Sequence, residues 1–538
     1  MILSLKDKVW WFALYSRVFV LATSALFNLL IPDHDADAFV APKSEIIQET
    51  FGDVAVRYLC GGLMRWDAQY FMHIAMYGYT YENCLAFFPL YPLVCRVVAQ
   101  VLYIIAGGIL SDFSLYLISS VCINMFCFVK SASILYNLSL RVLKNERLAY
   151  RACIFYCVNP ASIFFSASYS ESLYSCLTFY GLLKCGCGFK EKFSMNCGIV
   201  FGLSGVTRSN GILNIGFIGY KCLKTFFHET LPKCSREIRN FSVRILWMMP
   251  VILMISGVFI LPYILSVILS LLPFVSFQIY SYQKYCIPHN HSLPNFLVTF
   301  AKTNDLIIPG GSIQEEGHWC AMALPLSYSY IQSHYWNVGF LRYYQWKQIP
   351  NFVLAFPVVW IILSETYSYI KKHKRYCLYL GLYDFPKSKK ELSKDEGSYS
   401  KTVHLPEDVL PYVIHVLFLT VFSVLCVHVQ VTTRLISSSS PILYWFCAKI
   451  VSEDDDMSGT IDSSKLSDDL TKICRREKFT RRNMVQNDIE EMENLQSYWK
   501  VFVLGGIPST RKKIFIHLYF LLFMNVGTIL FSNFLPWT

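Results

Sequence analysis

The feature that most constrains the fold is a series of apolar runs, recurring along the whole chain, many of them long enough to cross a bilayer. The first extends from about Val9 to Ile31, and the last ends near Phe534. Backbone groups in lipid must be hydrogen-bonded within the chain, and the alternating pattern of barrel strands is absent. The sequence therefore predicts an all-α polytopic membrane protein with about 10–12 membrane segments.

Composition agrees with this class. The chain has 538 residues, of which 54% are hydrophobic and 16% charged, with a net charge of +11. Soluble domains carry about 25% charged residues. The basic residues cluster between apolar runs, as cytosolic loops do in membrane proteins. No nucleic-acid-binding motif accompanies them, so the expected partner is the lipid bilayer and not a nucleic acid.

We expect residues 1–538 to form a single membrane-embedded domain. Residues 32–84 and 280–350 are predicted as luminal loops, and residues 452–497 as a polar, disordered or loosely helical insertion. The first apolar run follows two lysines and no cleavage site comes after it, which indicates an uncleaved signal anchor that starts in the cytosol. Arg17 within this run must either snorkel or face the protein interior.

Two apolar segments have ambiguous topology. Ile245–Phe277 contains three prolines and is too long for one simple span, so it forms either two short spans or one kinked helix. A luminal loop before Leu85 and a basic, cytosolic cluster from Arg141 require an odd number of crossings between them. We therefore predict that the proline-containing run Leu85–Ala106 is a luminal-side or re-entrant helix.

The first candidate for chemistry is the triplet Arg65-Trp66-Asp67. Charged groups at the edge of a bilayer are costly unless they have a function. A tryptophan suits both the membrane interface and stacking on a sugar. Asp67 would then accept a proton from an attacking sugar hydroxyl. The alternative is an ordinary helix-capping acid.

Two further patches interrupt apolar runs. Glu171 ends a hydroxyl-rich stretch that begins at Asn159, and either lines a polar cavity or sits in the first turn of a capped helix. Arg208 and Asn210 lie between glycines, where the arginine either binds a lipid-linked phosphate or marks an interfacial helix break.

The predicted second luminal loop contains Trp336, Asn337 and Arg342 in an aromatic run. This run forms either a surface for a glycan or lipid headgroups, or an interfacial aromatic belt. Arg434, followed by four serines, either holds a phosphate or an acceptor sugar, or belongs to a short polar turn. Arg434 and Arg342 are the weaker candidates for phosphate binding, after Arg208.

We predict no metal site, because the pair His289 and His291 lacks further ligands at useful spacing. Most of the 19 cysteines lie in apolar runs, where a thiol behaves as a small hydrophobe. Three fall in the predicted luminal loops, and which of them pair stays open: Cys84, Cys286 and Cys320. The glycosylation sequon at residues 290–292 also lies on the predicted luminal side.

These patches resemble the PIG-V family of GPI mannosyltransferases, in the same order over most of the chain. The stretches that carry the resemblance are Arg65–Ala68, Ala86–Pro89, Asn159–Ser172, Arg208–Gly211, Tyr335–Leu341 and Gln430–Leu435 with the serines that follow. Residues 452–497 depart from the compact family pattern.

The resemblance implies a GT-C glycosyltransferase fold in the endoplasmic reticulum membrane. Such an enzyme uses dolichyl-phosphate mannose in the lumen and adds the second, α-1,6-linked mannose to the GPI-anchor precursor with inversion. Asp67 matches the position of the catalytic acid in the first luminal loop. No cofactor or metal is implied, in agreement with the absence of nucleotide-binding motifs. A small membrane partner subunit is a further possibility.

Two other classes stay open at this stage. A lipid or solute transporter or scramblase would also place arginine and glutamate in broken helices. The large aromatic loops and the absence of paired repeats argue against it. A non-catalytic subunit of a transferase complex is the third class, and mutation of Asp67 separates it from an enzyme.

Overall fold

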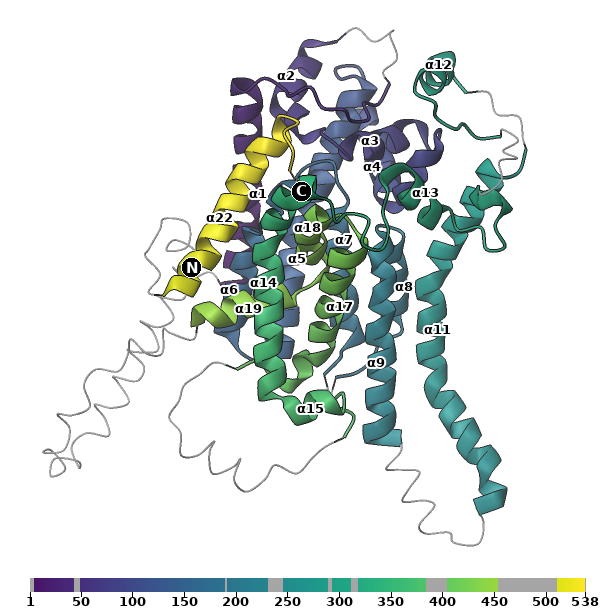
Figure 1. Cartoon of the computed structure of the whole chain (residues 1–538), viewed down its shortest axis with the longest axis vertical. Coiled ribbons are helices and arrows are strands. Elements are labelled where there is room, and N and C mark those ends of the chain that lie inside the picture. Colours follow the sequence, from purple (N-terminus) through teal and green to yellow (C-terminus); the bar gives the residue numbers. More distant parts are fainter. Residues whose placement is uncertain are drawn as a thin grey trace, which may run out of the picture.

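The computed structural model describes residues 4–42, 49–188, 191–230, 245–288, 293–310, 318–383, 404–452 and 510–537. Across these ranges the regular structure is helical and contains no strand, which confirms the all-α class (Figure 1). The His289 and His291 pair, the sequon at 290–292 and nearly all of the polar insertion lie outside the described residues.

The described part of the chain contains six helices long and apolar enough to cross a membrane. They are α1 (Leu5–Leu30), α5 (Asp112–Leu143), α11 (Ile245–Tyr285), α14 (Ile349–Lys372), α17 (Leu410–Cys426) and α22 (Arg511–Ser532). Shorter apolar helices accompany them: α4 (Leu90–Ala106), α8 (Asn196–Gly205) and α19 (Ile442–Ser452). Several expected membrane segments are therefore short helices and not full spans.

The centre of the bundle is formed by α5, α6 (Glu146–Cys157) and α7 (Glu171–Cys185), which pack closely together. Beside them, α8 approaches α11 through a Gly-x-x-x-Gly pair. A Cβ on Gly198 would lie 2.5 Å from the Ser266 carbonyl oxygen, and one on Gly202 would lie 2.5 Å from that of Leu269. Only glycine permits this backbone approach, which suits helix association in lipid.

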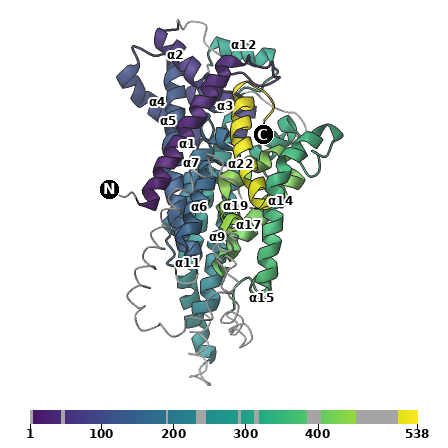
Figure 2. The same ribbon diagram turned by 90° about the vertical axis from the view of Figure 1, so that its left-hand side faces the viewer.

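One end of the bundle carries a cap of short helices (Figures 1 and 2). The cap consists of α2 (Phe51–Cys60), α3 (Ala68–Tyr77), α4, α12 (Asn295–Thr303) and α13 (Ser327–Trp336). Arg96 of α4 donates to the carbonyl oxygens of Ala75 and Met76 at the end of α3, at 2.7 and 3.2 Å. This proline-containing segment therefore packs within the cap, and its luminal-side or re-entrant position stays a prediction.

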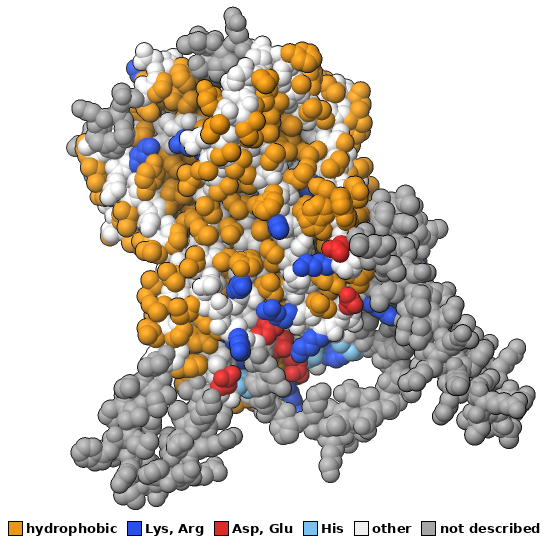
Figure 3. Space-filling view, turned by 180° about the vertical axis from the view of Figure 1, so that it is seen from behind, with side chains coloured by type: hydrophobic (Ala, Val, Ile, Leu, Met, Phe, Trp, Pro, Cys, Tyr) orange, Lys and Arg blue, Asp and Glu red, His pale blue; other side chains and the backbone are white. Residues whose placement is uncertain are grey.

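Charged side chains gather toward the opposite end of the molecule, while hydrophobic side chains cover much of the remaining surface (Figure 3). An ion pair at that end joins Lys224 to Asp408 across 2.9 Å. The segment Ile245–Phe277, for which two short spans or one kinked helix were predicted, lies within α11. This is one continuous helix of 41 residues and not two short spans.

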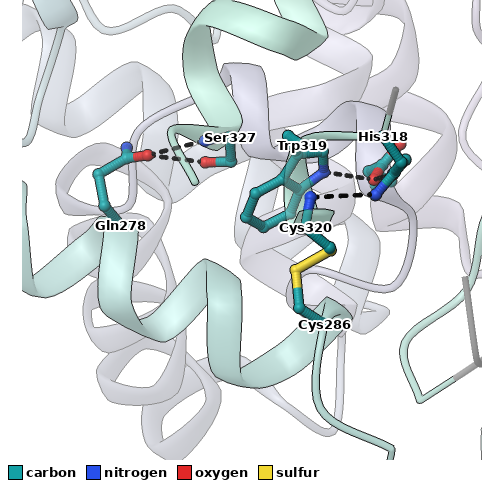
Figure 4. The surroundings of a disulfide bond; sticks show 7 residues. Gln278, Cys286, His318, Trp319, Cys320 and Ser327 are labelled. Atoms are coloured by element: carbon teal, nitrogen blue, oxygen red, sulfur yellow. Dashed lines mark hydrogen bonds and ion pairs between the residues drawn. A yellow bond between two sulfur atoms is a disulfide. The ribbon is translucent and has the colours of Figure 1, made fainter. Parts of the chain in front are cut away.

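A disulfide and a buried acid hold the part of the cap that follows α11 (Figure 4). Cys286 at the end of α11 is bonded to Cys320, whereas Cys84 is a buried free thiol. The fully buried Glu82 accepts hydrogen bonds from the His318 ring at 2.7 Å and the Trp319 indole at 2.8 Å. These bonds tie the two predicted luminal loops to each other.

Arg17 of α1 faces the protein interior, which decides between the two alternatives for this residue. Its guanidinium donates to the carbonyl oxygens of Ser162 and Cys157 at 2.7 and 3.0 Å. It also lies over the Phe128 ring, 3.9 Å from the centroid. A buried cation must be paired or fully hydrogen-bonded, and here it fixes the turn that leads into α7.

Candidate active site

Four charged residues that lie far apart in the sequence meet where four short helices begin. Asp67 immediately precedes α3, Glu171 is the first residue of α7, and Arg208 precedes η4 (Ser209–Asn214). Arg434 lies in the first turn of α18 (Thr432–Ser439). We call Asp67, Arg434, Glu171 and Arg208 the ion-pair chain, in their order of contact.

Arg434 is the centre of the ion-pair chain. Its Nη1 lies 3.1 Å from the Asp67 carboxylate, and its Nε lies 3.3 Å from the Glu171 carboxylate. Its guanidinium also lies over the rings of Phe164 and Tyr169, 5.0 and 5.4 Å from their centroids. Burial alone would lower the pKa of Arg434, but the charges of Glu171 and Asp67 outweigh this and raise it above its ordinary value.

The two carboxylates differ in access. The Glu171 side chain is 0% exposed and is also paired with Arg208, whereas the Asp67 side chain is 33% exposed. A buried carboxylate persists only when it is paired, and two arginines contact the Oε1 atom of Glu171. Of the two acids, Asp67 is therefore the more accessible, and Glu171 is the one enclosed between the arginines.

The backbone before α3 aims Asp67 into the site. Trp66 has a φ of 56°, a left-handed conformation that is unusual for a bulky residue and often marks a functional turn. The Asp67 N–H donates to the Tyr169 hydroxyl at 3.0 Å. Tyr169 therefore contacts both members of the Asp67–Arg434 ion pair, since its ring also lies under the Arg434 guanidinium.

Arg65, predicted to bind substrate, is committed elsewhere. Its guanidinium pairs with Asp33 at 2.9 Å, donates to Asn28 at 2.8 Å, and donates to the Ser532 carbonyl at 3.2 Å. These bonds connect the start of the cap to α1 and α22. The structure thus places Arg65 behind the turn that carries Asp67, and Trp66 packs edge-on against Phe534.

Asn210 links three elements behind Arg208. Its amide donates to the Tyr174 hydroxyl of α7 at 3.1 Å and to the Ser439 hydroxyl of α18 at 2.8 Å.

Several buried polar atoms around the ion-pair chain have no hydrogen-bond partner among the described residues. They are Glu171 Oε2, Arg208 Nε, Thr432 Oγ1, Ser437 Oγ and Ser440 Oγ. Buried polar atoms are normally satisfied, so these are places where a polar ligand or water fits.

The candidates from the second predicted luminal loop separate. Trp336 packs against Tyr70 and Phe87, with ring centroids 6.0 Å apart in both pairs, and so borders the helix that Asp67 begins. Asn337 adopts a left-handed conformation and ends α13, which is a typical helix-capping position. Arg342 donates to Ser333 at 2.8 Å on the exposed surface and does not join the ion-pair chain.

Sequence reasoning overlooked the tyrosines of the site. Tyr169, Tyr174 and Tyr328 hydrogen-bond to Asp67, Asn210 and Ser209, respectively, through their hydroxyl groups. Tyr169 belongs to the same hydroxyl-rich stretch that led to Glu171, so that stretch carried the signal. Among the described residues, no group of three or more histidine, cysteine, aspartate or glutamate side chains is arranged to hold a metal ion.

The described helices define a polytopic membrane protein in which a partly exposed acid lies beside a mostly buried arginine. The family model described as "Mannosyltransferase (PIG-V)" matches residues 6–538. The chain therefore belongs to the PIG-V mannosyltransferase family and is a glycosyltransferase. This membership sets aside the transporter and the non-catalytic subunit as alternatives.

Curated relatives cover nearly the whole chain. The GPI alpha-1,6-mannosyltransferase 2 of Cricetulus griseus is 36% identical over 98% of this chain and 97% of its own length. The human protein of the same name is 35% identical over the same shares. The GPI mannosyltransferase 2 of Gibberella zeae is 27% identical over 80% of this chain and 86% of its own. No solved structure matches the chain.

Proposed function

We propose that this protein transfers mannose from dolichyl-phosphate mannose to the GPI-anchor precursor, adding the second mannose through an α-1,6 linkage. The names of the full-length relatives support the acceptor and the linkage. The observation that carries the chemical part is the contact between Arg434 and the partly exposed Asp67. In this contact a partly exposed carboxylate, which can act as a base, lies next to a mostly buried guanidinium.

We place the reaction in the lumen of the endoplasmic reticulum, with the cap on the luminal side. Two features of the molecule support this orientation. The disulfide between Cys286 and Cys320 lies in the cap, and disulfides persist in oxidising compartments. Charged side chains gather toward the other end, as expected of the cytosolic side.

The proposed step is a single displacement with inversion. The acceptor hydroxyl oxygen attacks C1 of the mannose, and the bond from C1 to the phosphate oxygen breaks. The hydroxyl proton passes to Asp67, and dolichyl phosphate leaves with the bonding electrons. Arg434 lies 3.1 Å from the Asp67 carboxylate and holds it in position for this transfer.

The departing phosphate needs a cation, and the ion-pair chain supplies two. Arg208 and Arg434 both face Glu171, and the Arg208 Nε has no partner among the described residues. A planar guanidinium with a free N–H is well suited to a phosphate oxygen. Glu171 then acts as a positioning residue that holds both arginines. We propose that one base and these cations suffice without a metal, and chelator-resistant transfer would support this.

The test is rescue of surface GPI-anchored proteins in cells that lack the second GPI mannosyltransferase. The wild-type chain should restore them, and Asp67→Asn at equal abundance should not. Microsomes from the rescued cells should transfer labelled mannose only when dolichyl-phosphate mannose is supplied. Absence of rescue by correctly located wild-type protein would refute the proposed function. A small membrane partner subunit stays a prediction, to be tested by co-purification.

A further inference from the structure

An apolar groove runs between α9 (Ile215–Thr225) and α17, and we call it the α9–α17 groove. Its volume is about 270 Å³. One wall consists of Leu213, Gly216, Phe217 and Tyr220, and the other of Pro411, Ile414, His415 and Phe418.

The groove opens on the outside of the bundle. Ile414 and Phe418 on its α17 wall are 42% and 52% exposed. Because α17 is a candidate membrane span, this exposed wall faces lipid. Lipid chains can therefore enter the groove sideways from the bilayer.

Both walls lead to the ion-pair chain at the same end. α9 continues directly from η4, which starts after Arg208, and Leu213 of the groove belongs to η4 itself. α17 is followed by η9 (Val429–Val431) and then by α18, which carries Arg434. Each wall of the groove therefore belongs to a segment that runs on to an arginine of the ion-pair chain, and this arrangement is complementary to a lipid with one apolar chain and an anionic phosphate head.

We propose that the α9–α17 groove binds the polyprenyl chain of the mannosyl donor. This inference rests on the proposed function and assigns the binding site for the tail of that donor. In a polyprenyl phosphate the chain begins at the phosphate, so the tail must start beside the cations that hold the head. In the acceptor, sugars separate the reacting hydroxyl from the lipid, so its acyl chains have no need to start there.

The groove positions the tail of the donor and does not attract it through the hydrophobic effect. Lipid tails are as apolar as the groove walls, so moving a tail from bilayer to groove gains only packing. A side chain that fills the groove forces the tail elsewhere and shifts the phosphate away from the arginines. The effect should therefore depend on the length of the donor's tail.

Two glycines of α9 provide a matched test. A Cβ on Gly216 or on Gly219 meets no atom within 4 Å, so either position accepts a side chain without a clash. Only Gly216 lines the groove. The full-length Gly216→Leu and Gly219→Leu proteins are compared in microsomes. The donors are the mannosyl phosphates of a long dolichol and of a short, water-soluble prenol.

We expect Gly216→Leu to raise the KM for the long donor by about tenfold, as misfit in an apolar pocket does. Its KM and kcat for the short donor should match those of Gly219→Leu. A second pair of variants keeps the test decisive if a variant of the first pair misfolds. Ile414→Trp fills the groove from the other wall, and Leu522→Trp is its control, since Leu522 is 54% exposed on α22 and does not line the groove.

Several results would overturn the proposal. One is equal behaviour of the groove and control variants, and another is an equal change for both donors. A rise in the KM for the acceptor instead of the long donor would assign the groove to the acceptor's lipid. If the wild-type protein transfers mannose from neither donor, the proposed function itself fails, which is distinguishable from failure of the groove assignment.

Discussion

Arg434 and Asp67 lie 367 positions apart in the sequence and form an ion pair 3.1 Å long. The same guanidinium reaches Glu171, so one side chain connects the accessible acid to the buried acid, which also pairs with Arg208. Substitutions along this ion-pair chain should therefore not act independently.

Asp67→Asn should reduce mannose transfer by about 10²–10⁴-fold, because the amide keeps the size of the side chain and cannot accept the proton. Transfer is measured in microsomes at matched protein level. Asp37→Asn is the control, since Asp37 is an exposed acid of the same predicted loop. Near-normal transfer by Asp67→Asn would remove Asp67 from the mechanism.

Arg434→Gln should lower the transfer rate by about 10²-fold or more, because Asp67 loses its cation and Glu171 keeps only Arg208. The double variant with Asp67→Asn should be no worse than the more damaged single variant, since residues that act as a unit are not additive. Arg57→Gln, which breaks an exposed ion pair with Glu49, is the control. Multiplicative losses in the double variant would contradict the coupling.

Cys320→Ser should lower the stability of the cap by about 3–4 kcal/mol, the loop-entropy value for a bridge across 34 positions. Thermal unfolding in detergent measures the change, and an additional thiol-reactive gel shift that appears only after reduction, beyond that of the free cysteines, checks the bridge. Cys122→Ser, at an exposed free cysteine, should have no such effect. Labelling of Cys320 in the wild-type protein without reductant would disprove the disulfide.

The stability of the cap should fall as pH drops below 6.5, and His73 is the reason. Burial lowers the pKa of His73 to about 4, while its ring stacks on Tyr81 and bonds to Thr80. The unfolded histidine, with a pKa near 6.5, binds more protons between these values, so acid favours unfolding. The expected loss from pH 7.5 to 5.5 is about 1.4 kcal/mol.

Melting curves at the two pH values test this expectation. His73→Gln should reduce the pH dependence, because the glutamine does not titrate in this range. His334→Gln, at an exposed position of α13, should retain it. An unchanged dependence in His73→Gln would assign the effect to another group.

Much of this protein follows from the sequence because its signals are local. Apolar runs specify helices in lipid, since no other open backbone structure satisfies its hydrogen bonds there. Charged residues that interrupt those runs are costly, which is why Asp67, Glu171, Arg208 and Arg434 were recognisable as candidates. The family resemblance rests on the same local stretches.

Only the tertiary structure decided which charges meet. The sequence treated Arg208 as the first candidate for phosphate binding and Arg434 as a weaker one, yet Arg434 is the arginine beside Asp67. It also gave no reason to separate Arg65 and Arg342 from the ion-pair chain, although the first pairs with Asp33 and the second bonds to Ser333. Such pairings depend on how distant helix ends pack together, because a buried charge takes whichever partner the packing brings within reach.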